Sequence, residues 1–123
     1  MSREGILGTI AAIQNAKVLV DNGWCKNSFA KDSNGNSVHY LSNRAIKFDM
    51  SGALFRCSEE LSPSQRDMIV ATTQFVLTKK INPESIEFNT IIEFNDSCEN
   101  KYGVLNMLDN MLEILNQQLK EAV

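Results

Sequence analysis

The sequence has few of the features that mark a compartment or a membrane. It holds 3 Cys, 1 His and 1 Trp among 123 residues. No stretch approaches the roughly 20 apolar residues that a membrane-spanning helix needs. Polar residues interrupt the apolar N-terminal segment, and no signal-peptide cleavage site follows it. An odd number of cysteines without a signal peptide favours free thiols in a reducing compartment. We therefore expect a cytoplasmic protein that binds no membrane.

The sequence also has no excess of positive charge. Its 12 Lys and Arg residues are scattered and are outnumbered by 15 Asp and Glu residues, which gives a net charge of −3. Nucleic-acid-binding domains usually concentrate basic residues on one face. The glycine patterns of nucleotide-binding loops, GxGxxG and GxxxxGK[ST], do not occur. We expect neither nucleic-acid binding nor a phosphate-binding loop.

The cysteines and the histidine form no recognisable reactive or metal-binding motif. Cys25, His39, Cys57 and Cys98 are far apart, and no two cysteines have the short spacing of a zinc knuckle. A Cys25–His39 pair would still lack the third group that orients the base in a catalytic triad. We therefore predict no metal site, no cofactor and no catalytic residue, and we regard an enzyme as the less favoured possibility.

Size and periodicity predict the fold class. A chain of 123 residues fits one domain (1–123), and 43% hydrophobic with 22% charged residues is typical of a globular protein. Apolar residues recur at helical spacing over most of the chain. We predict a mainly all-α protein, a compact bundle of four to five helices with a small β-hairpin or ordered loop at about 28–40. The helices are expected at 4–22, 45–58, 62–80, 86–95 and 101–120.

Three local signals set the expected ends and contacts of these helices. Gly23 should end the first helix in a left-handed conformation, which glycine adopts readily. Ser62 can cap the third helix, Pro63 suits its first position, and Gln65 can complete a capping box. Gly52 costs a helix about 1 kcal/mol relative to alanine, so we expect a neighbouring helix to approach closely there.

Two segments are ambiguous by sequence. Apolar residues alternate within 86–95, as in a strand, but an Asn-Pro-Glu start at 82–84 favours a helix, and we prefer the short helix. An Asn-Gly pair at 34–35 predicts a tight turn that would join short strands at 28–30 and 38–40. Two strands alone are marginal in water, so the hairpin would have to pack on the helices.

The last predicted helix, 101–120, has an unusually broad apolar side. Its apolar residues cover about half of the circumference, whereas a surface helix usually shows a stripe of roughly 100°. Such a helix packs against more than one neighbour. It is therefore either central in the bundle or part of a homodimer interface.

Four short motifs follow one another along the chain and together resemble a known family. They are Gly23-Trp24, then Phe29-Ala30-x-Asp32 with Gly35 and Val38, then Gly52-Ala53-Leu54, and finally Phe94-Asn95-Asp96. In order and spacing they resemble small bacterial and phage proteins catalogued only as a domain of unknown function. The resemblance covers nearly the whole chain and implies a compact, mostly helical domain, but no activity.

The chain departs from this family at one position that bears on chemistry. Family members often carry Cys-Ala-Leu ahead of Gly-Ala-Leu, whereas this chain has Asp49, Met50 and Ser51 there. A carboxylate cannot replace a thiol nucleophile. The difference argues against a thiol enzyme.

Five residues are the candidate ligand-binding positions: Trp24, Asp32, His39, Asn95 and Asp96. They lie in the two irregular polar segments, and loops on a rigid scaffold often carry binding sites. The competing interpretation is structural, because Asn and Asp commonly serve turns and caps, and a Trp can close the end of a bundle.

These observations favour one function and leave an alternative open. We expect a non-enzymatic protein-interaction module that binds a protein partner or a second copy of itself. The alternative is a small-molecule-binding or hydrolase-like protein with a polar site between the 24–40 loop and the Asn95–Asp96 turn. A cavity that joins the two polar segments would favour the alternative.

Overall fold

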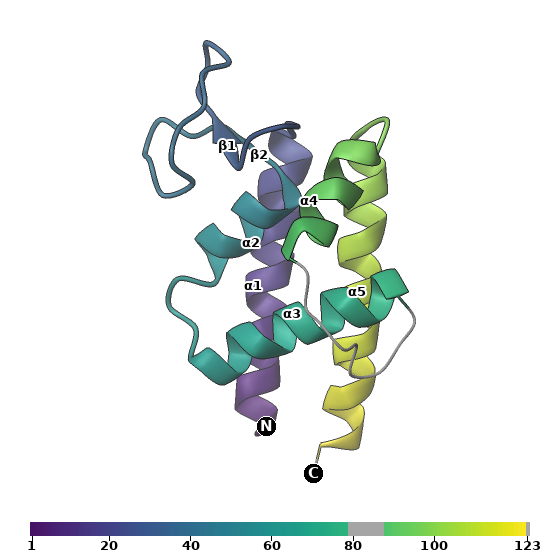
Figure 1. Cartoon of the computed structure of the whole chain (residues 1–123). Helices are drawn as coiled ribbons and strands as arrows, with labels where there is room; N and C mark the ends of the chain where they lie inside the picture. The colour runs from purple at the N-terminus through teal and green to yellow at the C-terminus, as the bar shows by residue number, and fades with distance from the viewer. Residues whose placement is uncertain (79–87, 123) are drawn as a thin grey trace.

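A computed structural model of the chain describes residues 1–78 and 88–122, which form five helices and one two-stranded antiparallel sheet (Figure 1). The elements are α1 (Arg3–Asn22), β1 (Ala30–Lys31), β2 (Lys47–Phe48), α2 (Met50–Cys57), α3 (Pro63–Thr78), α4 (Phe88–Ser97) and α5 (Lys101–Glu121). The predicted mainly α-helical bundle is confirmed. Within the described ranges, every helix is too short or too polar to cross a membrane.

Helices α1 and α5 lie side by side and run in opposite directions, so that both termini are at the same end of the molecule (Figure 1). Polar contacts join the two helices along their length. They are Lys17 Nζ to Asp109 Oδ1 at 2.6 Å, Lys101 Nζ to Asp21 Oδ1 at 3.1 Å, and Arg3 Nη1 to the Leu119 carbonyl at 3.3 Å. These contacts are exposed or half-exposed, so they set the alignment of the helices more than their stability.

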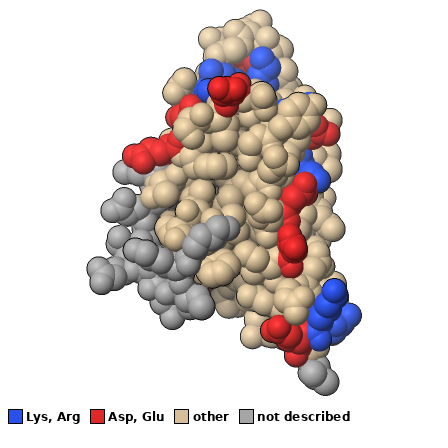
Figure 2. All heavy atoms as spheres, turned by 90° about the vertical axis from the view of Figure 1, so that its right-hand side faces the viewer, with Lys and Arg blue, Asp and Glu red and all other residues tan. Residues whose placement is uncertain are grey.

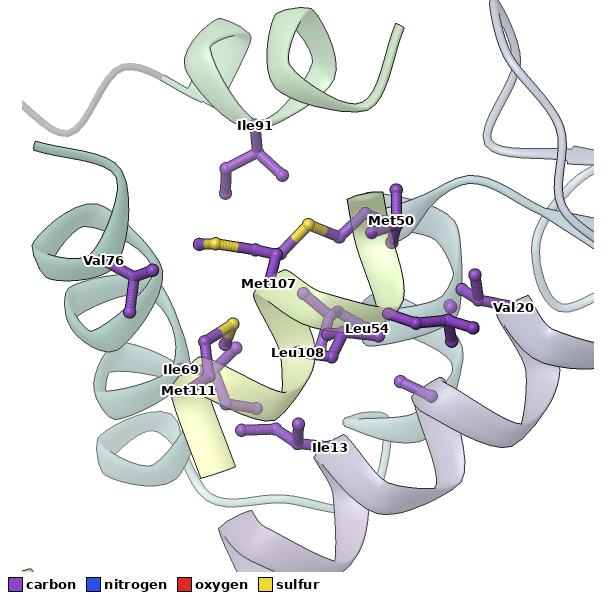
Figure 3. Close-up of a cluster of buried hydrophobic side chains, with 14 of the residues drawn as sticks. Ile13, Val20, Met50, Leu54, Ile69, Val76, Ile91, Met107, Leu108 and Met111 are labelled. Carbon is purple, nitrogen blue, oxygen red and sulfur yellow. The ribbon is translucent and has the colours of Figure 1, made fainter. Parts of the chain in front are cut away.

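The broad apolar side of α5 is used inside the chain. Leu108, Met111 and Leu115 are fully buried, and α5 packs on both α1 and α3. Figure 3 shows Leu108 and Met111 of α5 among side chains from α1, α2, α3 and α4. Charged side chains lie near the edges of the face on the α5 side, around a broad uncharged area (Figure 2). The broad apolar stripe of α5 is therefore used in packing against more than one helix of the same chain. Self-association through 101–120 stays a prediction.

The start of α3 confirms the predicted capping box. Ser62 Oγ accepts a hydrogen bond from the Gln65 backbone N–H at 3.3 Å, and Gln65 Oε1 accepts one from the Ser62 backbone N–H at 2.9 Å. Pro63 is the first helical residue. Gln65 Nε2 also donates to the Gly5 carbonyl at 3.0 Å, which ties α3 to α1. The predicted end near Lys80 lies outside the described residues.

Two of the predicted helix ends are wrong in their details. The helix expected over 45–58 begins only at Met50, because residues 47–48 pair as β2 and Asp49 caps the helix. Gly23 does end α1, but its φ is −172°, which is extended and not left-handed. A Cβ at Gly23 would collide with the Ile46 carbonyl oxygen, so the glycine serves a close backbone approach.

Gly52 allows a close approach too, but from a loop and not from a helix as predicted. A Cβ at this position would overlap the Phe29 carbonyl oxygen. The same stretch of backbone is also hydrogen-bonded to the start of α2, since the Asp49 N–H donates to the Phe29 carbonyl at 3.2 Å. The chain just before β1 is therefore pressed against the first turn of α2.

The predicted hairpin pairs with a different strand. The main partner of Ala30–Lys31 is Lys47–Phe48, not 38–40. Of the predicted pairing, the structure has a Lys31–Ser37 bridge and a bond from the Val38 N–H to the Ala30 carbonyl at 3.1 Å. The Asn-Gly turn is confirmed, with Gly35 at φ +80°. Residues 28–40 are thus an ordered loop, the other form that the sequence predicted.

The ambiguous segment is helical. Helix α4 spans Phe88–Ser97, so the short helix expected over 86–95 is confirmed over 88–95 and the strand is wrong there, whereas residues 86–87 lie outside the described residues. Ile91 and Asn95 are both buried, four residues apart on one face of α4. The Asn-Pro-Glu signal at 82–84 lies outside the described residues.

Candidate functional site

A polar junction forms where α4, the start of α2 and the chain after α1 meet, and Asn95 is at its centre. Asn95 is fully buried. Its Oδ1 accepts from Trp24 Nε1 at 2.8 Å and from the Met50 backbone N–H at 3.0 Å. Its Nδ2 donates to the Cys25 carbonyl at 3.2 Å and to Asp96 Oδ1 at 3.0 Å. An Asn amide has two donors and two acceptor sites, so all of its capacity is used within the protein.

Asp96 extends this junction to the chain after α1. Its Oδ1 also accepts from the Asn27 backbone N–H at 3.1 Å. Asn27 has a φ of 65°, the left-handed region in which a residue other than glycine is uncommon. The carboxylate therefore helps to hold a turn that the backbone alone would disfavour.

Asp49 places a carboxyl group inside the protein next to the junction. It is 1% exposed and caps α2, since its Oδ1 accepts from the Gly52 N–H at 2.6 Å. Burial raises the pKa of Asp49 from 3.8 to about 6; the Gly52 hydrogen bond lowers it, and the nearby Asp96 carboxylate raises it further. A raised carboxyl pKa occurs in general acids and bases, but it also follows from a buried cap alone.

Asp32 and His39 lie away from this junction, in the β1–β2 loop (residues 32–46). Asp32 Oδ1 accepts from the backbone N–H groups of Asn34 and Asn36, both at 2.9 Å, as in a turn held by its own side chain. His39 is exposed, and its Nδ1 accepts from the Leu41 N–H at 3.0 Å. Both side chains shape the loop.

The β1–β2 loop is fixed to α2 by an aromatic cluster and an arginine. The Tyr40 ring contacts Phe55 of α2 at 5.4 Å between centroids and Phe29 at 6.5 Å, and His39 stacks on Tyr40 at 4.3 Å. Arg56 Nη1 donates to the Tyr40 carbonyl at 2.9 Å and to the Ser42 carbonyl at 3.0 Å. Residues 40–42 of the loop are therefore fixed to α2, although the loop projects beyond the helices (Figure 1).

The three cysteines are free thiols, and none is activated. Burial, followed by the Asp49 carboxylate, raises the pKa of Cys25 to about 11. Burial also raises the pKa values of Cys57 and Cys98. Cys25 Sγ donates to the Ser28 carbonyl at 3.4 Å, so no base is bound to it. A thiol with a raised pKa is a poor nucleophile at neutral pH.

Across residues 1–78 and 88–122, no group of three His, Cys, Asp or Glu side chains is placed to hold a metal ion. Of the five candidate positions, the structure brings Trp24, Asn95 and Asp96 together and leaves Asp32 and His39 in the loop. The indole of Trp24 is hydrogen-bonded to a side-chain carbonyl, as expected of a residue that closes the bundle. A ligand site that joins all five residues stays a prediction.

Sequence reasoning missed two residues with unusual surroundings. The sequence motifs mark Asp49 only as a departure from a family pattern, although Asp ahead of Met-Ser-Gly is a typical helix-capping position. Ser51 stands out in the sequence only as part of the same departure. Its hydroxyl is the one fully buried side-chain polar atom without a hydrogen-bond partner among the described residues. Nothing else in the sequence singles out Ser51.

Comparisons with protein-family models, with curated proteins and with solved structures found no match. The resemblance to small bacterial and phage proteins therefore stays a prediction. Function has to be argued from the chain itself.

Proposed function

We propose that this protein is a non-enzymatic protein-interaction module that contacts its partner through the β1–β2 loop. The observation that carries the proposal is a loop anchored to α2 that exposes large apolar side chains. Leu41 is 44% exposed and Ile46 is 50% exposed. They flank a turn in which the Ala45 N–H donates to the Ser42 carbonyl at 3.2 Å, so the turn brings the two ends together.

The anchoring of this loop favours recognition. Arg56 and the Tyr40–Phe55 contact hold the loop before any partner is bound. A surface that is already ordered loses less conformational entropy on binding. Ordered loops on a rigid scaffold commonly carry binding residues.

The charge of this region indicates the kind of partner. Residues 26–47 contain four Lys or Arg and one Asp, whereas the whole chain has a net charge of −3. Arg44 and Lys47 are exposed beside the two apolar residues. Electrostatic complementarity then favours a partner surface with an apolar centre and acidic residues around it.

The alternative of a small-molecule or hydrolase-like site at the polar junction gains no support from the geometry. The Asn95 amide is fully hydrogen-bonded within the protein. A ligand would have to break these bonds to reach it.

Affinity capture from cells of origin with matched variants tests the proposal. L41E/I46E should lose a specific protein that the unaltered chain retains, since two carboxylates replace the apolar contacts. L7E/V18E is the matched control, because Leu7 and Val18 are also exposed, at 44% and 56%, but lie on α1. Capture that survives L41E/I46E, or that is lost equally in the control, would contradict the proposal.

Light scattering separates a second copy from a different partner. A monomer over a wide concentration range supports a different protein as the partner. A dimer that L41E/I46E dissociates would assign the same loop to self-association, and a dimer that this variant leaves intact would contradict the loop as the interface.

A further inference from the structure

The structure contains a cavity of about 140 Å³ between α2, α3 and α4, which no residue of the β1–β2 loop lines. Its inner wall is aliphatic, with Leu54 of α2, Ile69 of α3 and Ile91 of α4 each 5–6% exposed. Figure 3 shows these three side chains directed toward the same interior region from three helices. Phe55, Val70 and the exposed Arg66 complete the wall toward the surface.

One polar group in this wall is unpaired. Ser51 lines the cavity, is 2% exposed, and its hydroxyl has no hydrogen-bond partner. The other hydroxyls of the wall are committed: Thr73 Oγ1 donates to the Ile69 carbonyl at 2.8 Å, and Ser58 Oγ donates to the Phe55 carbonyl at 3.3 Å. A buried hydroxyl without a partner is costly, so a native protein usually supplies one.

We propose that this cavity binds a small, uncharged, mostly apolar molecule with one hydrogen-bonding group, which pairs with the Ser51 hydroxyl. The volume sets the size, since an apolar cavity of about 150 Å³ accommodates a benzene ring. The wall sets the polarity, because Leu54, Ile69 and Ile91 offer only dispersion contacts. Ser51 sets the position of the single polar group, which is a hydroxyl, an N–H or a carbonyl oxygen.

Water is a poor occupant of such a site. A buried water usually makes about three hydrogen bonds, and at least two polar partners are needed to hold it. Here Ser51 is the one hydroxyl of the wall whose proton is free, because Thr73 and Ser58 already donate theirs, and the aliphatic side chains offer no polar partner. A ring with a single polar substituent forms a hydrogen bond with the Ser51 hydroxyl and also buries its apolar surface in the cavity. Both interactions favour binding.

Arg66 is not the group that pairs with the polar substituent of the ligand. Its Nε donates to the Ser58 carbonyl at 3.1 Å, and its Nη2 donates to the Glu59 carbonyl at 2.6 Å, so the guanidinium caps the end of α2. The charge stays at the surface edge of the cavity. The deep end is uncharged, which is why the ligand class is uncharged.

Phenol and toluene are the matched probes, because they share the ring and differ in the hydroxyl. Titration at millimolar concentration is followed by NMR of the methyl groups of Leu54, Ile69 and Ile91. Both probes should shift these signals. Once the free energy of transferring each probe from water to an apolar solvent is subtracted, phenol should bind more tightly than toluene. In S51A, phenol affinity should fall at least about tenfold, since its hydroxyl is then buried unpaired, while toluene affinity is unchanged or higher.

Two further variants complete the test. V70W should block both probes, because a larger side chain at the half-buried edge fills the cavity, and V18W is the matched control on the exposed face of α1. S33A, an exposed loop serine, controls for loss of a hydroxyl. The proposal is overturned if a folded protein shows no shifts at these methyl groups. It is equally overturned if S51A weakens phenol and toluene alike. Neither result bears on the β1–β2 loop.

Discussion

The side chain of Asn95 connects three parts of the chain that are far apart in sequence. It joins Trp24 and Cys25 after α1, Met50 at the start of α2, and Asp96 beside it on α4. All four bonds are in or near the protein interior, where an unpaired polar group is costly. Asn95 is therefore a structural residue, and its neighbours depend on it for their hydrogen bonds.

Replacement of Asn95 with alanine should destabilise the fold strongly. N95A leaves the Trp24 indole N–H, the Met50 N–H and the Cys25 carbonyl without this partner. At about 1–3 kcal/mol for each buried unsatisfied group, partly relieved by water, we expect a loss of about 3 kcal/mol or more in unfolding free energy. Urea denaturation measures it. N116A, an exposed site on α5, should change stability by less than about 0.5 kcal/mol. An N95A value close to that of N116A would refute the structural role.

Asp49 should make stability depend on pH in a defined window. Its pKa is about 6 in the folded protein and 3.8 ordinarily, so the folded state holds the proton more tightly. The contribution of Asp49 to stability is therefore fully present below about pH 4, is lost as the pH rises toward 6, and stays lost above it. The total is on the order of 3 kcal/mol, from 1.36 kcal/mol per unit of pKa.

The variant D49N isolates this effect. An amide oxygen can still accept from the Gly52 N–H, but it carries no charge to bury. We expect D49N to be more stable than the unaltered protein at pH 8, with the difference shrinking or reversing at pH 4. D49A removes the cap as well and should cost about 1 kcal/mol relative to D49N. Parallel pH profiles for the unaltered protein and D49N would show that Asp49 is not the group responsible.

At the scale of elements, the packing of the 28–31 segment on α2 depends on one glycine. The Phe29 carbonyl occupies the space that a side chain at Gly52 would need. G52A should therefore destabilise the protein by about 2 kcal/mol, although alanine favours a helix by about 1 kcal/mol. Thermal and urea unfolding both report this change.

Gly8 provides the matched comparison within a helix. A Cβ there would meet the end of the Gln65 side chain and no backbone atom, so Gln65 would have to shift and weaken its bonds to the Gly5 carbonyl and the Ser62 N–H. G8A should thus cost clearly less than G52A, because the helix preference of alanine, about 1 kcal/mol, offsets much of the loss of the Gln65 bonds. If G52A and G8A changed the unfolding free energy equally, the close approach of the Phe29 carbonyl to α2 would be contradicted.

Strand pairing explains why the second helix begins later than the sequence predicts. Residues 45–58 have enough apolar content to be helical, yet residues 47–48 pair with β1 and Asp49 then caps the helix at Met50. Pairing in the register Ala30–Phe48 and Lys31–Lys47, between residues far apart in the sequence, is a tertiary event. Local propensity cannot report it.

At the scale of the whole molecule, the rate at which the cysteines are modified measures how often the fold opens. Cys25 is 6% exposed and has a pKa of about 11 against an ordinary 9.0, so its thiolate is about a hundredfold scarcer at neutral pH than that of an ordinary thiol. Iodoacetamide should therefore modify Cys25 at least about a hundredfold more slowly than a free thiol, as read by mass spectrometry.

Unfolding supplies the control for this measurement. In urea all three cysteines should react at similar rates, and N95A should accelerate the modification of Cys25 in buffer, because opening of the junction exposes it. Rapid modification of Cys25 in the folded, unaltered protein would mean that the junction is open or that the thiol is activated.

The sequence by itself determined the helical class, the capping box at Ser62 and Gln65, the turn at Gly35 and the helix over most of 86–95. These features follow from periodicity and from caps within a few residues, so they are local. Only the tertiary structure decided that β1 pairs with β2, that Asn95 joins three segments, and that Ser51 faces a cavity without a partner. These depend on which distant groups come to lie within hydrogen-bonding or van der Waals distance, and that information is in the packing of the whole chain.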